Sequence, residues 1–99
     1  MYNANAITVD TQGVLTIDEF DQEVRKVMQE ENCDYIRAAI LTAWRYMVSI
    51  KNSVSDPLSE AHKVCIGAAI SKWRTGDTKW YNGMKQLTTR FMEWGYKYD

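Results

Sequence analysis

The feature that most constrains the fold is a series of helix-start signals, each followed by apolar residues spaced three or four apart. Thr16 and Glu19 have the spacing of a capping box, in which each side chain bonds the other residue's backbone N–H. Asp34 is a further cap residue, and Asp56-Pro57 combines a cap with proline at the first helical position. Short connections between such helices favour antiparallel neighbours. The sequence therefore predicts an all-α fold, a small antiparallel bundle of about four helices.

The sequence also places the ends of the helices. The second helix is expected over about residues 35–51. Gly76 is expected to end the third helix as a left-handed cap, and Asp77 is expected to cap the fourth. Gly95 should stop the fourth helix before a tail of residues 96–99.

Two of the predicted helices have a well-defined core face. The third carries small residues that permit close packing against a neighbour, and the fourth has one stripe with steps of four, three, four and three. These core positions are Leu58, Ala61, Cys65, Ala68, Ala69 and Trp73 in the third helix, and Trp80, Met84, Leu87, Phe91 and Trp94 in the fourth.

The second helix carries more apolar residues than one stripe needs. Leu41 and Val48 lie off the stripe to which Trp44 belongs. A helix that is apolar on more than one side is central in its bundle or meets a second chain. We expect these three residues to form a contact with another chain, and a symmetric homodimer is the commonest solution. The alternative is that the first helix and the N-terminal arm cover Leu41 and Val48 within the monomer.

Basic and aromatic residues alternate in the C-terminal third. Lys79 and Arg90 lie off the apolar stripe, and Tyr96 and Tyr98 extend the aromatic content to the last residues. Basic groups bind phosphates and exposed aromatic rings stack on bases, so this part is a candidate nucleic-acid surface. The alternative is an ordinary solvated helix face, since the pI of about 5.8 is low for a nucleic-acid module.

Length and charge indicate one globular domain, with residues 1–14 as a short extended arm and residues 15–99 as the helical domain. The net charge is −1, but residues 1–35 carry eight acidic and two basic residues, whereas residues 36–99 carry five acidic and ten basic ones. We expect the first helix to lie across the later ones and neutralise them. The alternative is two separate charged faces for partners.

Two cysteines, Cys33 and Cys65, are too few for a disulfide framework. No apolar run approaches the roughly 20 residues of a membrane span. The first residues lack the basic and apolar segments of a secretory signal. We therefore expect a cytoplasmic protein with free thiols and no membrane contact.

The segment of residues 8–19 resembles the calcium loop of EF-hand proteins. Gly13 falls at the turn position, Leu15 at the apolar position and Glu19 at the bidentate ligand position. However, Thr8 stands where the pattern has aspartate, and Gln12 is a poor replacement for a carboxylate. A capping box after a glycine turn explains the same residues, so we predict no metal site.

The segment of residues 54–61 resembles the all-helical chorismate mutases, which also have a long first helix, a short loop and two further helices. The resemblance implies a site in which cationic side chains hold a dicarboxylate substrate. Glu60 matches that motif, but Ser59 stands where the motif has arginine. The acidic first helix offers only Arg25 and Lys26, which is too few cations for such a site.

Other catalytic chemistry has little support. His62 is the single histidine, and Cys65 is close enough to share its helix face. A Cys–His nucleophile also needs an orienting group and an oxyanion site, and no motif marks either. There is no glycine-rich phosphate loop. We therefore expect no enzymatic activity and no cofactor.

A protein-interaction role remains as the leading hypothesis. Four tryptophans and an over-apolar second helix exceed what one small core needs, and Trp, Tyr and Arg are the residues that anchor interfaces. Small acidic helical chains are often regulators or inhibitors encoded by phages and mobile elements, and we expect a non-catalytic regulator of that kind. Nucleic-acid binding is the second hypothesis, and a small-ligand or enzyme site between helices the third. The candidate contact residues are Leu41, Trp44, Val48, Lys79, Arg90, Tyr96 and Tyr98.

Overall fold

The computed structural model describes residues 14–98 and the side chains of residues 14–95. Within this part the chain forms four helices and no strand: α2 (Ile17–Glu31), α3 (Tyr35–Ser49), α4 (Pro57–Lys72) and α5 (Asp77–Tyr98). The predicted all-α bundle of about four helices is thus confirmed. The predicted N-terminal arm lies, except for Val14, outside the described residues.

The predicted starts of α2, α3 and α4 are confirmed by side-chain caps. The Thr16 hydroxyl accepts the N–H of Glu19 at 3.1 Å, and the Glu19 carboxylate accepts the N–H of Thr16 at 2.9 Å. Asp34 and Asp56 each accept a backbone N–H from three residues further on, at 2.9 and 3.1 Å. These bonds satisfy N–H groups that the first helical turn leaves without a partner.

The connection between α4 and α5 differs from the prediction. Gly76 does not cap α4 in a left-handed conformation, because α4 already ends at Lys72. The Gly76 carbonyl instead accepts the N–H of Trp80 at 3.0 Å, so Gly76 precedes α5 and Asp77 is the first helical residue rather than the cap. The cause is tertiary packing: Trp73 leaves the helix in an extended conformation, and its ring packs against Trp80.

The other helix ends also shift from their predicted places. Gly95 does not stop α5, which continues to Tyr98. A glycine inside a helix costs only about 1 kcal/mol relative to alanine, which is too little to end a helix that is packed along its length. α3 ends at Ser49, two residues before the expected end.

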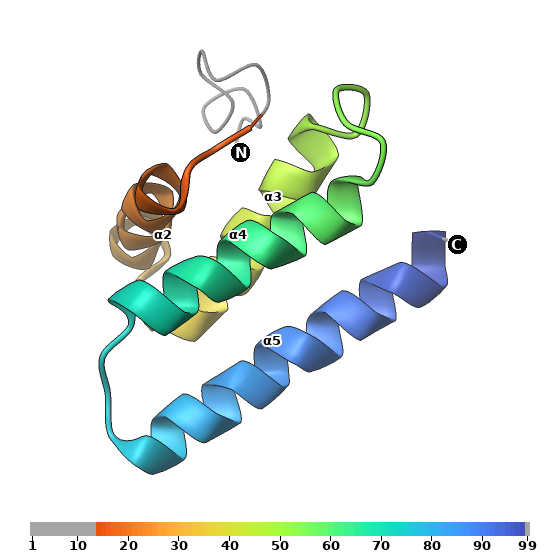
Figure 1. Cartoon of the computed structure of the whole chain (residues 1–99). Coiled ribbons are helices and arrows are strands. Elements are labelled where there is room, and N and C mark those ends of the chain that lie inside the picture. The colour runs from red at the N-terminus through yellow and green to blue at the C-terminus, as the bar shows by residue number, and fades with distance from the viewer. Residues whose placement is uncertain (1–13, 99) are drawn as a thin grey trace.

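α3 and α4 are the central helices of the bundle, because each contacts the other three. α2, α3 and α4 each contact the other two, and α5 packs against α3 and α4 with at most slight contact to α2. Figure 1 shows α4 and α5 running side by side and antiparallel, with α3 behind α4 and α2 across one side. The over-apolar sequence of α3 is explained in large part by this central position, which buries Ile36, Ala38, Ala39, Thr42, Ala43, Tyr46 and Met47.

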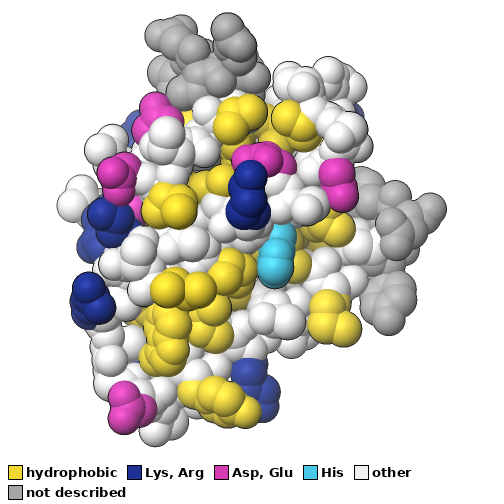
Figure 2. All heavy atoms as spheres, in the orientation of Figure 1, with side chains coloured by type: hydrophobic (Ala, Val, Ile, Leu, Met, Phe, Trp, Pro, Cys, Tyr) yellow, Lys and Arg dark blue, Asp and Glu magenta, His cyan; other side chains and the backbone are white. Residues whose placement is uncertain are grey.

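The predicted core faces of α4 and α5 are confirmed. The predicted small residues of α4 are buried, as are Leu87, Phe91 and Trp94 of α5, while Leu58, Trp80 and Met84 are half-buried against the core. Trp73, which was expected in the third helix, follows the end of α4 and is also half-buried. Figure 2 shows further apolar side chains gathered along the seam between α4 and α5. On these two helices Ile70, Tyr81 and Met92 are large apolar residues that remain more than half exposed.

A polar network joins α2, α3 and α4 at one side of the core. The Tyr35 hydroxyl donates to Asp21 Oδ1 at 2.7 Å, and Arg25 Nε donates to Asp21 Oδ2 at 3.0 Å. Arg25 also donates to the carbonyl of Lys72 at 3.3 Å, and the Lys72 ammonium pairs with Asp18 at 2.8 Å. The ion pair between Asp18 of α2 and Lys72 of α4 is an example of the neutralisation between the acidic first helix and the later helices that the charge distribution suggested.

The four tryptophans form two pairs at different places in the bundle. Trp73 packs on Trp80 with ring centres 5.1 Å apart, and Tyr35 is stacked on Trp73 at 6.3 Å. Trp44 and Trp94 form the second pair, also at 5.1 Å. Part of the aromatic surplus is therefore used inside the chain. None of the helices in the described part is both long and apolar enough to cross a membrane.

Candidate protein-interaction site

The outward side of α3 carries a stripe of residues that the monomer covers only in part. Leu41 and Trp44 are half-buried and pack against the core, whereas Val48 is 39% exposed. The expectation that both Leu41 and Val48 lie away from the core is therefore right for Val48 and only partly right for Leu41. Arg37, one helical turn before Leu41, continues the same stripe and is exposed.

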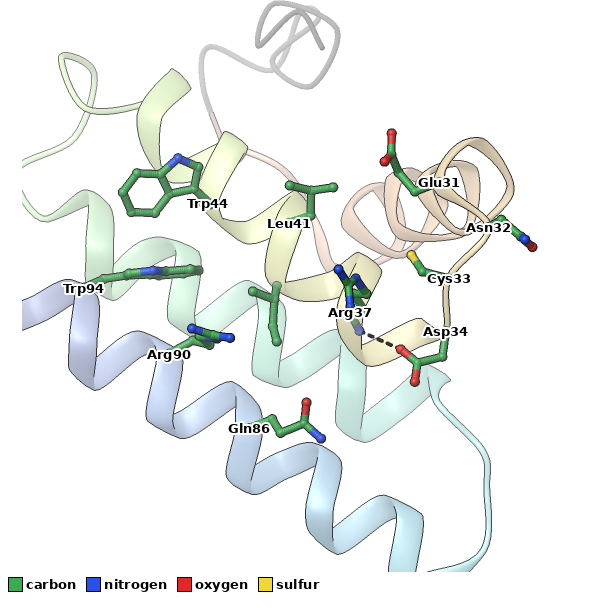
Figure 3. A pocket seen from close by; sticks show the side chains of 11 residues that line it. Glu31, Asn32, Cys33, Asp34, Arg37, Leu41, Trp44, Gln86, Arg90 and Trp94 are labelled. Atoms are coloured by element: carbon green, nitrogen blue, oxygen red, sulfur yellow. Dashed lines mark hydrogen bonds between the residues drawn. The ribbon is translucent and has the colours of Figure 1, made fainter. Parts of the chain in front are cut away.

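A groove of about 970 Å³ opens beside this stripe, between α3, α5 and the turn from α2 to α3. Leu41 and Trp44 line it from α3, and Arg90 and Trp94 line it from α5 (Figure 3). The contact between Trp44 and Trp94 bridges the two helices. The groove thus brings together three of the residues that the sequence singled out, Leu41, Trp44 and Arg90.

Charged side chains of both signs surround the stripe. α3 contains no acidic residue, and Arg37 has no ion-pair partner among the described residues. Arg90 pairs with Glu93 at 3.2 Å, but both side chains are about half exposed, so water screens the pair and it contributes little. Acidic groups lie at both ends of the stripe. Glu31, the last residue of α2, and Asp34, the cap of α3, line the groove near Arg37, and Asp56, the cap of α4, lines the hollow beside Val48.

The remaining predicted contact residues lie elsewhere. Val48 lines a separate hollow of about 370 Å³ with Lys51 and Pro57, at the far end of α3. Lys79 lines a third hollow, of about 650 Å³, near the connection between α4 and α5. The side chains of Tyr96 and Tyr98 lie outside the described ones. The described members of the predicted set are thus one stripe on α3 with Arg90 beside it, plus a distant lysine.

The hollow around Lys79 is rich in cations. Arg25, Lys72 and Arg74 line it together with Lys79. Arg25 pairs with Asp21 and Lys72 with Asp18, so carboxylates offset two of these four charges. Only Arg74 and Lys79 lack an ion-pair partner among the described residues. This hollow adjoins the groove beside α3, because Asp34 and Gln86 line both.

Sequence reasoning missed most residues of the groove, Trp94 and Arg37 among them. Trp94 was assigned to the core stripe of α5, and it is indeed 8% exposed, yet it also lines the groove. Arg37 was not singled out. Its position four residues before Leu41 is the signal that could have found it, because residues four apart share a helix face.

The residues considered for catalysis are in packing positions. The His62 ring packs on Phe91 with centres 4.7 Å apart. Burial raises the pKa of the Cys65 thiol to about 12, and burial is also the main cause that raises the pKa of Cys33. Both cysteines are free and hold their protons, whereas a nucleophilic cysteine needs the thiolate.

The residues considered for metal binding are only partly described. The Glu19 carboxylate is engaged in the capping box, and Thr8, Gln12 and Gly13 of the loop that resembles an EF-hand lie outside the described residues. Within residues 14–95 no group of three His, Cys, Asp or Glu side chains is arranged to hold a metal ion.

Comparison of the chain with protein-family models, with curated proteins and with solved structures returned no match.

Proposed function

We propose that the protein acts without catalysis, by binding another protein through the outward stripe of α3 and the groove beside it. The observation that carries the proposal is the meeting of Trp44, Trp94 and Arg90 with Leu41 in one groove. Tryptophan and arginine dominate the binding energy of protein interfaces, because they combine a large apolar area with a polar group.

The same reasoning favours a regulator or inhibitor as the biological role. The groove offers a surface for recognition, while the Cys65 thiol is buried and the His62 ring packs on Phe91. A small domain of this kind changes its target by occupying a surface of it. We propose that it does so in the cytoplasm, where both cysteines would stay reduced.

Capture of binding proteins from the native cell tests this proposal when a matched pair of variants is used. Val48→Glu places a charge on the α3 stripe. Tyr81→Glu places the same charge at a residue of α5 that is 64% exposed and that lines neither the groove nor the hollows of Val48 and Lys79. A partner retained by wild type and by Tyr81→Glu but lost with Val48→Glu supports the proposal. A partner retained equally by both variants refutes the site. Circular dichroism of each variant checks that the helices remain.

Nucleic-acid binding is the second candidate, because four cationic side chains surround the hollow that contains Lys79. It ranks lower because Asp18 and Asp21 offset two of those charges. Non-specific binding to phosphates weakens steeply with salt. Tight binding that resists salt and is abolished by Arg74→Ala combined with Lys79→Ala would make this the leading function.

A further inference from the structure

We infer that the free protein covers the α3 stripe with the same stripe of a second copy, in an antiparallel two-fold contact. The inference rests on the proposed function and deepens it, because it names what regulates access to that site: the second copy and the target protein exclude each other. Three properties of the stripe support it, namely its spacing, its symmetry and the charges at its two ends.

The outward residues of α3 repeat with the spacing of a coiled-coil seam. The stripe extends beyond Arg37 to Asp34, the cap of α3, and beyond Val48 to Lys51, in the turn that follows the helix. Its members are three or four residues apart throughout: Asp34, Arg37, Leu41, Trp44, Val48 and Lys51. The first four line the groove along α3 (Figure 3), and the last two line the hollow that contains Val48. Residues with this repeat pack against a second helix at a crossing angle of about 20°, so another helix fits the stripe.

The stripe has the same spacing when it is followed in either direction. A two-fold axis that crosses α3 midway between Leu41 and Trp44 therefore brings every member of the stripe opposite a member in the second copy. Leu41 faces Trp44 on both sides of the axis, and Arg37 faces Val48 further out. A two-fold contact requires this property, because the same surface must serve both copies.

The charges at the two ends of the stripe agree with this register. One end carries Glu31 and Asp34 beside Arg37, and the other carries Lys51 beside Asp56. The two-fold axis places these ends against each other, so that Asp34 faces Lys51 of the second copy. Each end of the pair then contains acidic and basic groups from both copies, and no end gathers charges of a single sign. The spacing selects the register, and the charges permit it.

The centre of the contact covers apolar surface that the monomer leaves in water. Leu41 and Trp44 are half-buried, and Val48 is 39% exposed. The stripe from Asp34 to Lys51 is about 25 Å long at 1.5 Å per residue. One helix of this length from each copy makes a small contact, whereas permanent dimers bury about 2,000 Å² or more. We therefore expect a weak dimer, which a target protein that binds the stripe can displace.

Sedimentation equilibrium of the full chain over micromolar concentrations measures this dimer, and two variants test its register. Val48→Arg places an arginine opposite Arg37 of the second copy, and the dimer contains that contact twice. We expect its dissociation constant to rise at least about tenfold, because like charges that face each other across an interface are strongly unfavourable. Arg37→Glu combined with Val48→Arg places opposite charges at the same two contacts. This double variant should dimerise within about threefold of wild type, since one exposed ion pair contributes little by itself.

Tyr81→Arg is the matched control. It places the same charge at a residue of α5 that is 64% exposed and that lines neither the groove nor the hollows of Val48 and Lys79. Its dissociation constant should equal that of wild type. Circular dichroism of each variant checks that the helices remain.

Several results would overturn the inference. A wild-type chain that sediments as a monomer at all concentrations would show that the stripe does not bind a second copy. A dimer that Val48→Arg leaves intact, or that the double variant fails to restore, would place the contact elsewhere or in another register. The proposed function survives these results if Val48→Glu still loses the cellular partner. If the dimer behaves as expected but Val48→Glu retains that partner, the proposed function and the regulatory role fail while the dimer stands, so the two failures are distinguishable.

Discussion

Replacement of Tyr35 by phenylalanine removes one oxygen atom and tests the polar network that joins three helices. The hydroxyl donates to Asp21 at 2.7 Å, and the Asp21 side chain is 12% exposed, so water cannot easily replace the lost bond. A buried hydrogen bond to a charged group contributes about 1.5–3 kcal/mol. The phenyl ring keeps the shape that stacks on Trp73. Tyr35→Phe should therefore lower the free energy of unfolding by about 1.5–3 kcal/mol.

Urea denaturation followed by far-UV circular dichroism measures this loss, with Tyr81→Phe as the control. Tyr81 is 64% exposed, and its replacement should change the free energy of unfolding by less than about 0.5 kcal/mol. In a thermal melt each kcal/mol corresponds to a shift of about 4–8 °C for a domain of this size. If Tyr35→Phe falls within about 0.5 kcal/mol of wild type, the bond to Asp21 does not hold the helices together and the argument fails.

Four further substitutions test single sites. Gly95→Ala should raise the free energy of unfolding by about 0.5–1 kcal/mol through helix propensity. Gly83→Ala should instead lower it by about 1–2 kcal/mol through overpacking, because a Cβ at Gly83 would overlap the ring of Trp73. A stabilised Gly83→Ala in the same urea titration would contradict this. Thr42→Val should stabilise the protein by about 1 kcal/mol, since the buried hydroxyl bonds to no described residue; a loss in the thermal melt would reveal a partner for it. Burial raises the pKa of the Cys65 thiol from 9.0 to about 12, so between these values the folded state holds a proton that the unfolded chain has lost. The contribution of this thiol to the free energy of unfolding should therefore be fully present below pH 9 and decrease as the pH rises toward 12. The free energy of unfolding should decrease less steeply with pH in Cys65→Ala than in wild type. Equal pH dependence of the two proteins would show that Cys65 is not the cause.

Helix starts were predictable from local sequence, because each depends on one side chain that bonds a nearby backbone N–H. Thr16, Asp34 and Asp56 illustrate this. Helix ends were less predictable, because they depend on distant contacts. Gly76 carries a local stop signal, but Trp73 ends α4 earlier by packing against rings of α3 and α5.

The candidate site was predictable only as an excess of apolar residues on the second helix. The sequence places Leu41 and Val48 off the main stripe, but it cannot show that α2 and α4 cover the other sides of α3. Nor does it show that α5 brings Arg90 and Trp94 beside Trp44, since these residues lie far apart in the chain. Lys79 and Arg90 share a helix, yet they line different hollows, which helical periodicity alone does not resolve.

The arrangement of α5 has a consequence for how the protein opens. α2, α3 and α4 contact one another in a closed triangle, whereas α5 rests on α3 and α4 from one side. Local unfolding follows such differences in packing. The free energy of opening that hydrogen exchange reports should therefore be lower for the amides of α5 than for those of α3. The groove is present only while α5 is docked, and a bound partner would therefore slow this exchange. At a partner concentration of 100 times Kd the expected increase in the opening free energy is about 2.7 kcal/mol. The binding of a partner and the docking of α5 are in this sense coupled equilibria.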